Sequence, residues 1–175
     1  MSEAKAQDAN AAPDLQNALL GIDESSPLGA LRSQRREIMG FIQSNYDALL
    51  EPADTAGVSR MERGLLALRV AVLEESQPLI EHYRRYLSAE NAPAELVAAV
   101  QKRTLDQSLS PRLLALLEHV DRLTLEPRAA APHHLHALKE HGLSDANLVT
   151  ISQLIAFISF QVRALVGLQL LGKGQ

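Results

Sequence analysis

Hydrophobic residues recur at intervals of three and four along most of this chain. The pattern covers residues 27–50, 61–73, 77–87, 93–102, 111–123, 132–142 and 145–171. This is the repeat of an amphipathic helix. No stretch alternates apolar and polar residues with the period of two that half-buried strands show, and no Asn-Gly or Asp-Gly hairpin turn occurs. The sequence therefore predicts an all-α fold.

Serines and prolines mark where several of these helices begin. Ser26–Pro27 and Ser110–Pro111 each place a capping serine before a proline, which suits the first helical position. Ser59 is followed three residues later by Glu62, the spacing of a capping box. Glu62 can therefore serve the helix start, a function, or both.

The N-terminal segment differs from the rest of the chain. Residues 1–14 are small and polar without an apolar repeat, whereas residues 15–22 hold a single apolar cluster that we expect to dock as a short turn. We predict a mobile tail over residues 1–22, followed by one helical domain over residues 23–175.

The last predicted helix, residues 145–171, is the most apolar segment. Its length would span a bilayer, but Gln153, Gln161 and Arg163 interrupt it. Arginine alone costs roughly 2.5–3.5 kcal/mol near a bilayer centre, so we predict a helix central to a core and no membrane span. A stripe of mostly small residues at helical spacing is expected to pack on a neighbouring helix, either within the chain or across a dimer axis. It consists of Ser152, Ala156, Ser159, Arg163 and Gly167.

Composition narrows the classes of protein and site. Hydrophobic residues make up 46% and aromatic residues 3%, which favours helices packed through aliphatic side chains. The net charge of −4 and the absence of a basic tract argue against nucleic acid as a partner. No cysteine is present, which excludes disulfides and thiolate chemistry. The polar, acidic first residues do not form a cleavable signal pattern, so we expect a cytoplasmic protein.

The stretch from Ser59 to Leu87 holds the residues most suited to chemistry. Arg69 lies within an apolar run, and a buried arginine needs a carboxylate partner, for which Glu62 and Glu75 are the candidates. His82 follows on the next helix, on a face where a packed or surface histidine is the common alternative to a catalytic one.

Other histidines are interpreted as structural. His133 with His136, and His134 with His141, have helical spacing, but no carboxylate or cysteine completes a ligand set, so we predict neither a metal nor another cofactor. His119 is expected on a solvated helix face.

Three segments resemble the alkylhydroperoxidase D / carboxymuconolactone decarboxylase superfamily. They are LLALRVAVLEESQPLIEHYRRYL, GLSDANLVTISQLIAFISFQVRALVGLQLL and SPLGALRSQRREIMGFIQSNYDALLEPAD. The resemblance covers roughly residues 26–172 and is closest to a peroxidase-related branch. It implies an all-helical alkylhydroperoxidase-D-like bundle and homo-oligomers, commonly dimers, trimers or hexamers.

The motif of the family's peroxidases is Cys-x-His-Cys-x-x-x-His, preceded by a glutamate about three helical turns earlier. Aligning its last histidine with His82 places Glu75 and Pro78 at the two cysteine positions and Gln77 at the middle histidine. The nearest earlier acid is Glu62. The peroxidase reaction needs a thiolate to attack the peroxide and a second thiol to resolve the intermediate. We therefore predict that this chain is not a thiol peroxidase.

Three roles remain open on this resemblance. The chain can be a peroxidase-related scaffold that has lost its redox dithiol and binds a small molecule. It can be a lyase of the decarboxylase type, acting on a small lactone or carboxylic acid with His82 paired to Glu62 or Glu75 as acid/base. It can also be a non-catalytic partner of a cysteine-bearing family member. A carboxylate substrate would need a cation, and the candidates are Arg69, Arg84, Arg85 and Arg163.

Overall fold

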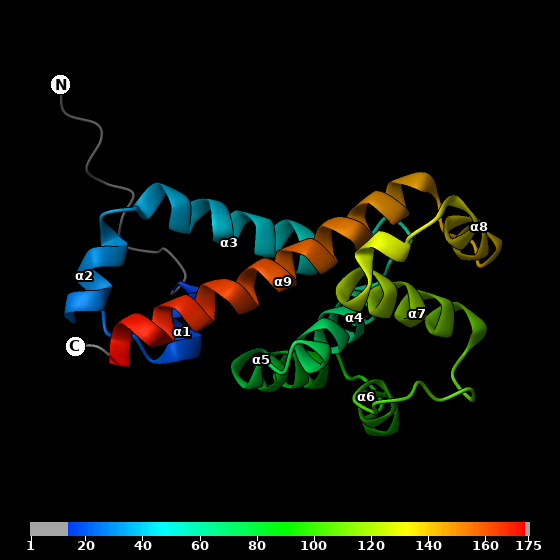
Figure 1. Ribbon diagram of the computed structural model, residues 1–175, viewed down its shortest axis with the longest axis horizontal. Helices are drawn as coiled ribbons and strands as arrows, with labels where there is room; N and C mark the ends of the chain where they lie inside the picture. The colour runs from blue at the N-terminus through cyan, green and yellow to red at the C-terminus, as the bar shows by residue number, and fades with distance from the viewer. Residues whose placement is uncertain (1–13, 174–175) are drawn as a thin grey trace.

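The computed structural model describes residues 14–173, which form nine α-helices and one 3₁₀ turn and contain no strand, as the all-α prediction required. The longest helix, α9, runs across the whole molecule (Figure 1). Helices α1 to α3 lie beside its C-terminal half, and α4 to α8 lie toward its N-terminal half. The elements are α1 (Leu15–Leu20), α2 (Pro27–Ser33), α3 (Arg36–Leu50), α4 (Arg60–Leu73), α5 (Gln77–Ala89), α6 (Ala94–Val100), α7 (Pro111–Leu125), η1 (Pro127–Ala129), α8 (Pro132–Glu140) and α9 (Asp145–Lys173).

Helix α4 is the centre of the core. It packs against α3, α5, α6, α7 and α9, and every residue from Arg63 to Ala71 is buried. A helix enclosed on all sides is apolar all round rather than striped. The capping box predicted at its start is confirmed, because the Ser59 hydroxyl accepts from the Glu62 amide and a Glu62 carboxylate oxygen accepts from the Ser59 amide.

Arg69 is the one charged side chain in the middle of α4, and only 1% of it is exposed. The prediction that Glu62 or Glu75 pairs with it is wrong. Its Nε and Nη2 atoms donate to the two carboxylate oxygens of Asp121 on α7, each at 2.6 Å. The remaining donors reach the carbonyls of Val100, Lys102 and Arg103, which follow α6 or end it. A residue 52 positions away supplies the charge because α7, not α4 itself, faces the Arg69 side of the helix.

The region before α4 also differs from the prediction. One helix over residues 27–50 is expected, but the chain turns at Gln34–Arg35 and forms α2 and α3. The break lets Arg32 on α2 contact Asp14 and Gln16 at α1 while α3 lies along α9. Residues 15–20 form α1 and pack on α5 and α9, so the apolar cluster docks as expected and belongs to the packed body. The predicted mobility of residues 1–13 lies outside the described residues.

His119 on α7 is buried, with 4% exposure, so its predicted position on a solvated face is wrong. Helix α8 packs against α7. Burial lowers the pKa of His119, with smaller contributions from Arg122 and His134. The lowered pKa favours the neutral ring, which is the form that burial in an apolar position penalises less.

Helix α9 has one buried face and one exposed face. Its buried residues include Ile151, Ile155, Ile158 and Leu165, and they contact the helices beneath. The helix is long and apolar enough to cross a membrane, judged by length and composition alone, with a third of its most apolar window buried in the protein. The inner face of α9 is therefore buried against other helices, whereas its outer face exposes apolar side chains.

Close packing of α4 on α5 depends on Gly64. A Cβ atom at this position would lie 2.8 Å from two ring carbons of Tyr86 and 2.9 Å from a methyl carbon of Leu87. The glycine therefore sets how closely the Tyr86 ring approaches α4.

We predict that Asp121→Asn lowers the free energy of unfolding by about 3 kcal/mol, because it leaves the Arg69 charge buried without its counter-ion. Urea unfolding followed by circular dichroism measures this. The control is Lys102→Met, which removes the exposed Lys102–Asp106 pair and should leave stability essentially unchanged. Equal effects of the two variants would contradict the central role of Arg69.

We predict opposite effects for two glycine substitutions. Gly64→Ala should lower the free energy of unfolding by about 1–3 kcal/mol through steric overlap. Gly40→Ala, where an added Cβ meets nothing within 4 Å on helix α3, should raise it by about 0.5–1 kcal/mol. The same unfolding measurement tests both, and a stable Gly64→Ala variant would show that α5 is free to move away from α4.

Candidate functional site

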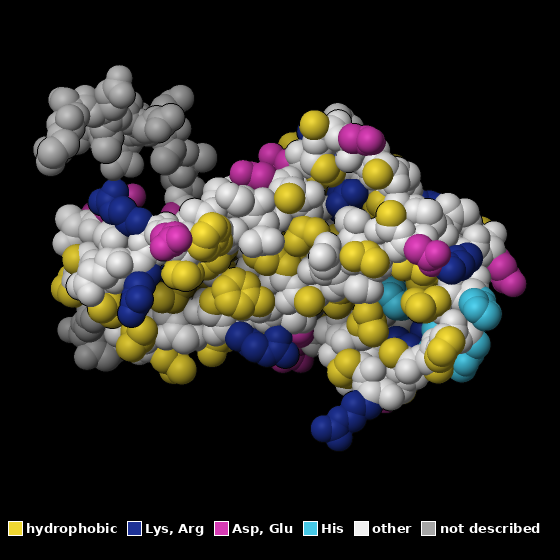
Figure 2. Space-filling model, turned by 90° about the horizontal axis from the view of Figure 1, so that it is seen from above, with side chains coloured by type: hydrophobic (Ala, Val, Ile, Leu, Met, Phe, Trp, Pro, Cys, Tyr) yellow, Lys and Arg dark blue, Asp and Glu magenta, His cyan; other side chains and the backbone are white. Residues whose placement is uncertain are grey.

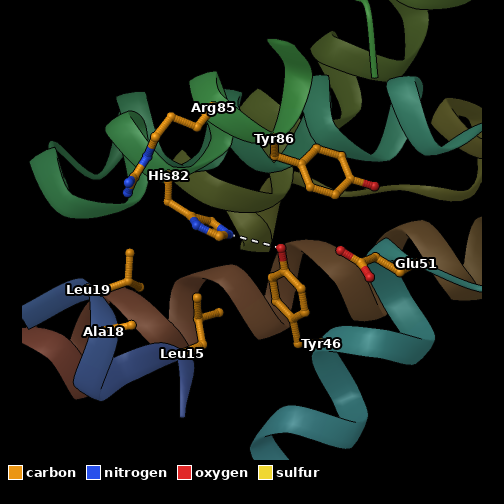
Figure 3. A pocket seen from close by; sticks show the side chains of 8 residues that line it. All are labelled: Leu15, Ala18, Leu19, Tyr46, Glu51, His82, Arg85 and Tyr86. Carbon is orange, nitrogen blue, oxygen red and sulfur yellow. Dashed lines mark hydrogen bonds between the residues drawn. The ribbon is translucent and has the colours of Figure 1, made fainter. Parts of the chain in front are cut away.

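A cavity of about 380 Å³ lies between α1, α3 and α5. Figure 3 shows its lining, with His82, Arg85 and Tyr86 projecting from α5, Tyr46 and Glu51 from the end of α3, and apolar side chains from α1 opposite them. The α1 residues are Leu15, Ala18 and Leu19. The amphipathic pattern of α5 produces this arrangement, since Tyr83 and Leu87 face the core and His82 falls on the flank.

His82 and Tyr46 form the polar contact inside the cavity. The Tyr46 hydroxyl lies 2.9 Å from Nε2 of His82, and their rings are tilted at a centroid distance of 5.7 Å. The buried Tyr83 ring meets the imidazole edge-on at 4.9 Å. Two aromatic rings thus fix the imidazole plane, and Nδ1 has no hydrogen-bond partner among residues 14–173.

Burial controls the charge of this pair. Burial, assisted by the positive charge of Arg85, lowers the pKa of His82 to about 4. Burial also raises the pKa of Tyr46 far above its ordinary value, assisted by the negative charge of Glu51. At neutral pH both groups are therefore uncharged, and the imidazole is an available proton acceptor.

The cavity combines four chemical elements. Arg85 supplies a cation beside the imidazole (Figure 3), and Glu51 supplies a carboxylate at the end of α3. Helix α1 supplies an apolar wall, and His82 supplies a neutral nitrogen. Tyr86 closes one side, because its hydroxyl donates to the Leu50 carbonyl at 2.7 Å. This set suits a small molecule with an acidic group at one end and an apolar body.

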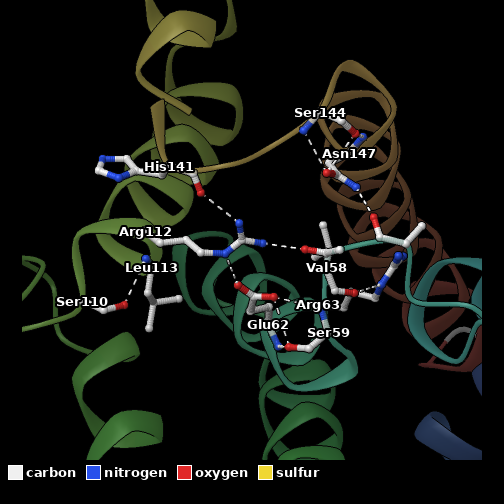
Figure 4. Close-up of polar contacts among 12 residues, drawn as sticks. Val58, Ser59, Glu62, Arg63, Ser110, Arg112, Leu113, His141, Ser144 and Asn147 are labelled. Carbon is white, nitrogen blue, oxygen red and sulfur yellow. Dashed lines mark hydrogen bonds and ion pairs between the residues drawn. The ribbon is translucent and has the colours of Figure 1, made fainter. Parts of the chain in front are cut away.

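Glu62, the first carboxylate predicted to serve His82, belongs to a different cluster (Figure 4). It accepts from Arg112 Nε on α7 at 2.7 Å while completing the capping box with Ser59. Arg112 also donates to the carbonyls of His141 and Gly57. Burial raises the pKa of Glu62, but the hydrogen bonds from Arg112 and Ser59 outweigh it and hold the pKa below its ordinary value. Glu62 is a structural anion that joins α4 to α7.

Glu75, the second predicted carboxylate, lies in the turn between α4 and α5. It is exposed, has a backbone φ of 55° and does not line the cavity. The predicted acid/base pair of His82 with Glu62 or Glu75 is therefore not formed in the described structure. The physical reason is that His82 faces α1 and α3, whereas Glu62 faces α7 and Glu75 faces solvent.

The structure also identifies site residues that the sequence did not. Tyr46 appears in the sequence only as a core position of a helix, and Glu51 only as the residue after it. Among the four candidate cations, Arg85 lines the cavity. Arg69 forms an ion pair with Asp121, and Arg163 forms one with Glu74. The i, i+3 spacing of His82 and Arg85 on one helix was the available signal for this choice.

Comparison with solved structures finds several similar proteins, among them the following three. An uncharacterized peroxidase-related protein from Silicibacter sp. TM1040 matches with a TM-score of 0.71 and 16% identity, over 91% of this chain and 85% of that protein. An uncharacterized peroxidase-related protein with an alkylhydroperoxidase AhpD core, from Ralstonia eutropha JMP134, matches with a TM-score of 0.69 and 16% identity, over 87% and 82%. A protein of unknown function from Agrobacterium tumefaciens, described as a putative antioxidant defence protein AhpD, matches with a TM-score of 0.68 and 17% identity, over 78% and 91%.

A scan against protein-family models finds no match, and a search of curated proteins finds no similar sequence. The structural similarity covers 78–91% of this chain and 82–91% of the others, and at these identities it establishes the fold. The chain has the all-helical fold of AhpD-like, peroxidase-related proteins.

Proposed function

We propose that this protein is a peroxidase-related, AhpD-like scaffold without a redox dithiol, and that it binds a small organic carboxylate in the His82 cavity. The observation that carries the proposal is the combination of a cysteine-free chain with a formed cavity around His82 and Arg85. The AhpD-like fold supports the peroxidase-related assignment.

The absence of cysteine rules out the dithiol route for peroxide reduction by this chain. That route transfers a peroxide oxygen to a thiolate and ends in a disulfide, so it needs two sulfur atoms. At the positions that the family motif gives to cysteines, Glu75 offers a carboxylate and Pro78 no nucleophile. The neighbouring His82 then has no thiol to deprotonate.

The cavity chemistry favours a carboxylate ligand with an apolar body. The Arg85 guanidinium can pair with a carboxylate through two parallel hydrogen bonds. Leu15 and Leu19 can cover the apolar part, and the His82 imidazole can contact a polar atom of the ligand.

A second candidate is a lyase acting on a small lactone or carboxylic acid. The observation that favours it is the low pKa of His82, which keeps the imidazole neutral and able to accept a proton at pH 7. The hydrogen-bond partner in such a site is the Tyr46 hydroxyl rather than a carboxylate.

We predict no peroxide consumption by the wild type or by His82→Ala when a dithiol reductant is supplied. In a separate NMR binding experiment, small carboxylates with an apolar body, such as hexanoate and benzoate, should bind more tightly than acetate and should shift the His82 resonances. Arg85→Met should weaken that binding at least tenfold, about 1.4 kcal/mol.

The matched control for this experiment is Arg84→Met, which removes the adjacent exposed arginine that does not line the cavity and should leave binding unchanged. Peroxide turnover that His82→Ala abolishes would contradict the proposal. Equal weakening of binding by the two arginine variants would show that Arg85 acts only through its positive charge and makes no specific contact with the ligand.

We predict that NMR titration of His82 gives a pKa of about 4, and that Arg85→Met raises it without restoring the ordinary value of 6.5, since burial is the larger cause. Because the unfolded state takes up the proton first as pH falls, the folded state loses stability between pH 6.5 and 4. His82→Gln should therefore show a smaller loss of stability from pH 7 to pH 4.5 in urea unfolding. An identical pH dependence would show that the His82 ring is solvated.

A further inference from the structure

The His82 cavity carries one cation and one carboxylate that do not pair with each other. Arg85 on α5 and Glu51 at the end of α3 both line the cavity, and both residues are exposed. Neither forms an ion pair within residues 14–173. Arg85 donates from Nε to the Glu81 carbonyl at 3.4 Å, which leaves the outer nitrogens of its guanidinium available. The rim of the cavity therefore presents two opposite charges that the chain itself does not use.

The two charges lie on opposite sides of the His82–Tyr46 pair (Figure 3). Arg85 lies beside the imidazole, and its positive charge acts with burial to lower the pKa of His82. Glu51 lies beyond the Tyr46 ring, and its negative charge acts with burial to raise the pKa of Tyr46. A bound molecule that contacts both charges has to extend across the two rings, whose centroids are 5.7 Å apart.

The position of Glu51 is unfavourable for its own helix. It is the C-terminal cap of α3, where the helix dipole presents its negative end. Asp47 lies one turn earlier, and the last turn of α3 has no basic residue. A carboxylate that opposes the helix dipole, forms no ion pair and lines a cavity breaks a local rule of helix stability, as binding groups often do. This end of the cavity attracts a cation.

We propose that the His82 cavity binds a zwitterion, with a carboxylate and an ammonium group at opposite ends of an aliphatic body. This inference rests on the proposed function and specifies the class of its ligand. The carboxylate pairs with Arg85 and the ammonium group pairs with Glu51, while the apolar side chains of α1 cover the methylenes between them. Between the charges, the neutral His82–Tyr46 pair offers hydrogen bonds without a competing charge.

The separation of the two charges selects for the length of the ligand. An α-amino acid carries its ammonium group and its carboxylate on one carbon, so it cannot reach both sides of the ring pair. An ω-amino acid such as 6-aminohexanoate places a flexible methylene chain between its charges. Because Arg85 and Glu51 are both exposed, the two ends of such a ligand stay at the rim and neither has to lose its water completely.

A second hollow in the described structure lacks this combination. Exposed hydrophobic side chains gather over the half of the molecule that holds α2, α3 and the end of α9 (Figure 2), and a groove of about 220 Å³ lies between these helices. Its lining includes Arg32 and Arg35 but no carboxylate. The opposed charges are therefore a property of the His82 cavity and not of apolar hollows in this fold generally.

NMR titration with hexanoate, 6-aminohexanoate and hexylamine tests the inference. The wild type should bind 6-aminohexanoate about fivefold more tightly than hexanoate, which is the gain expected from one exposed ion pair. Glu51→Gln should remove this preference and leave hexanoate binding equal or tighter, because the carboxylate of hexanoate gains nothing from Glu51. Arg85→Met should weaken the binding of both carboxylates but not that of hexylamine.

The matched control is Asp47→Asn, which removes an exposed carboxylate one turn before Glu51 that does not line the cavity. It should keep the preference for 6-aminohexanoate. An equal loss of preference in the two variants would overturn direct pairing with Glu51 and leave only the general negative charge of the helix end. Glycine should bind no more tightly than acetate, since its two charges are too close together.

The outcomes for the zwitterion differ from those for the proposed function. Hexanoate binding that depends on Arg85, without any gain from the ammonium group, would overturn the zwitterion while the carboxylate site stands. A gain that Glu51→Gln leaves intact would also overturn it. Absence of binding by hexanoate and by 6-aminohexanoate would overturn the proposed function and the zwitterion with it.

Discussion

The bidentate contact between Arg69 and Asp121 is the constraint on which the rest of this fold depends. Helix α4 is enclosed on all sides, so its single central charge has no access to water and needs a fixed counter-ion. The guanidinium also satisfies carbonyls at the end of α6 and beyond. One side chain thereby fixes α4, α7 and the connection between them, and this frame holds α5 in place.

Two further arginines donate to several carbonyls near the start of α4. Arg63 donates to the carbonyls of Leu49, Val58 and Thr55, and Arg112 donates to Glu62 and to two loop carbonyls. Irregular segments bring unpaired carbonyls to the core boundary, and a guanidinium with five donors satisfies several at once. Glu62 is part of this scaffold, which explains why it is absent from the cavity although it lies close to His82 in sequence.

The cavity is a consequence of how α5 sits on this frame. Gly64 lets the Tyr86 ring lie against α4, and the same helix then presents His82 and Arg85 to α3 and α1. Its polar centre is a neutral imidazole and a tyrosine hydroxyl without a thiol, and Glu51 is the carboxylate in its lining. The AhpD-like fold of this chain therefore holds a cavity lined by a neutral imidazole and an arginine, in a sequence without cysteine. The outer face of α9 carries exposed apolar side chains, among them Val149, Phe160 and Leu170, that no other helix within residues 14–173 covers.

The sequence by itself determined the helical class, most helix starts, the capping box of Ser59 and Glu62, and the absence of thiol chemistry. These follow from local spacing and residue type, which need no knowledge of neighbours. It also singled out His82 and included Arg85 among four cations. Only the tertiary structure decided that Asp121 pairs with Arg69, that Tyr46 contacts His82, that His119 is buried and that residues 27–50 form two helices. Each of these depends on which faces of distant helices meet, and helical periodicity shows that a face is apolar without showing what covers it.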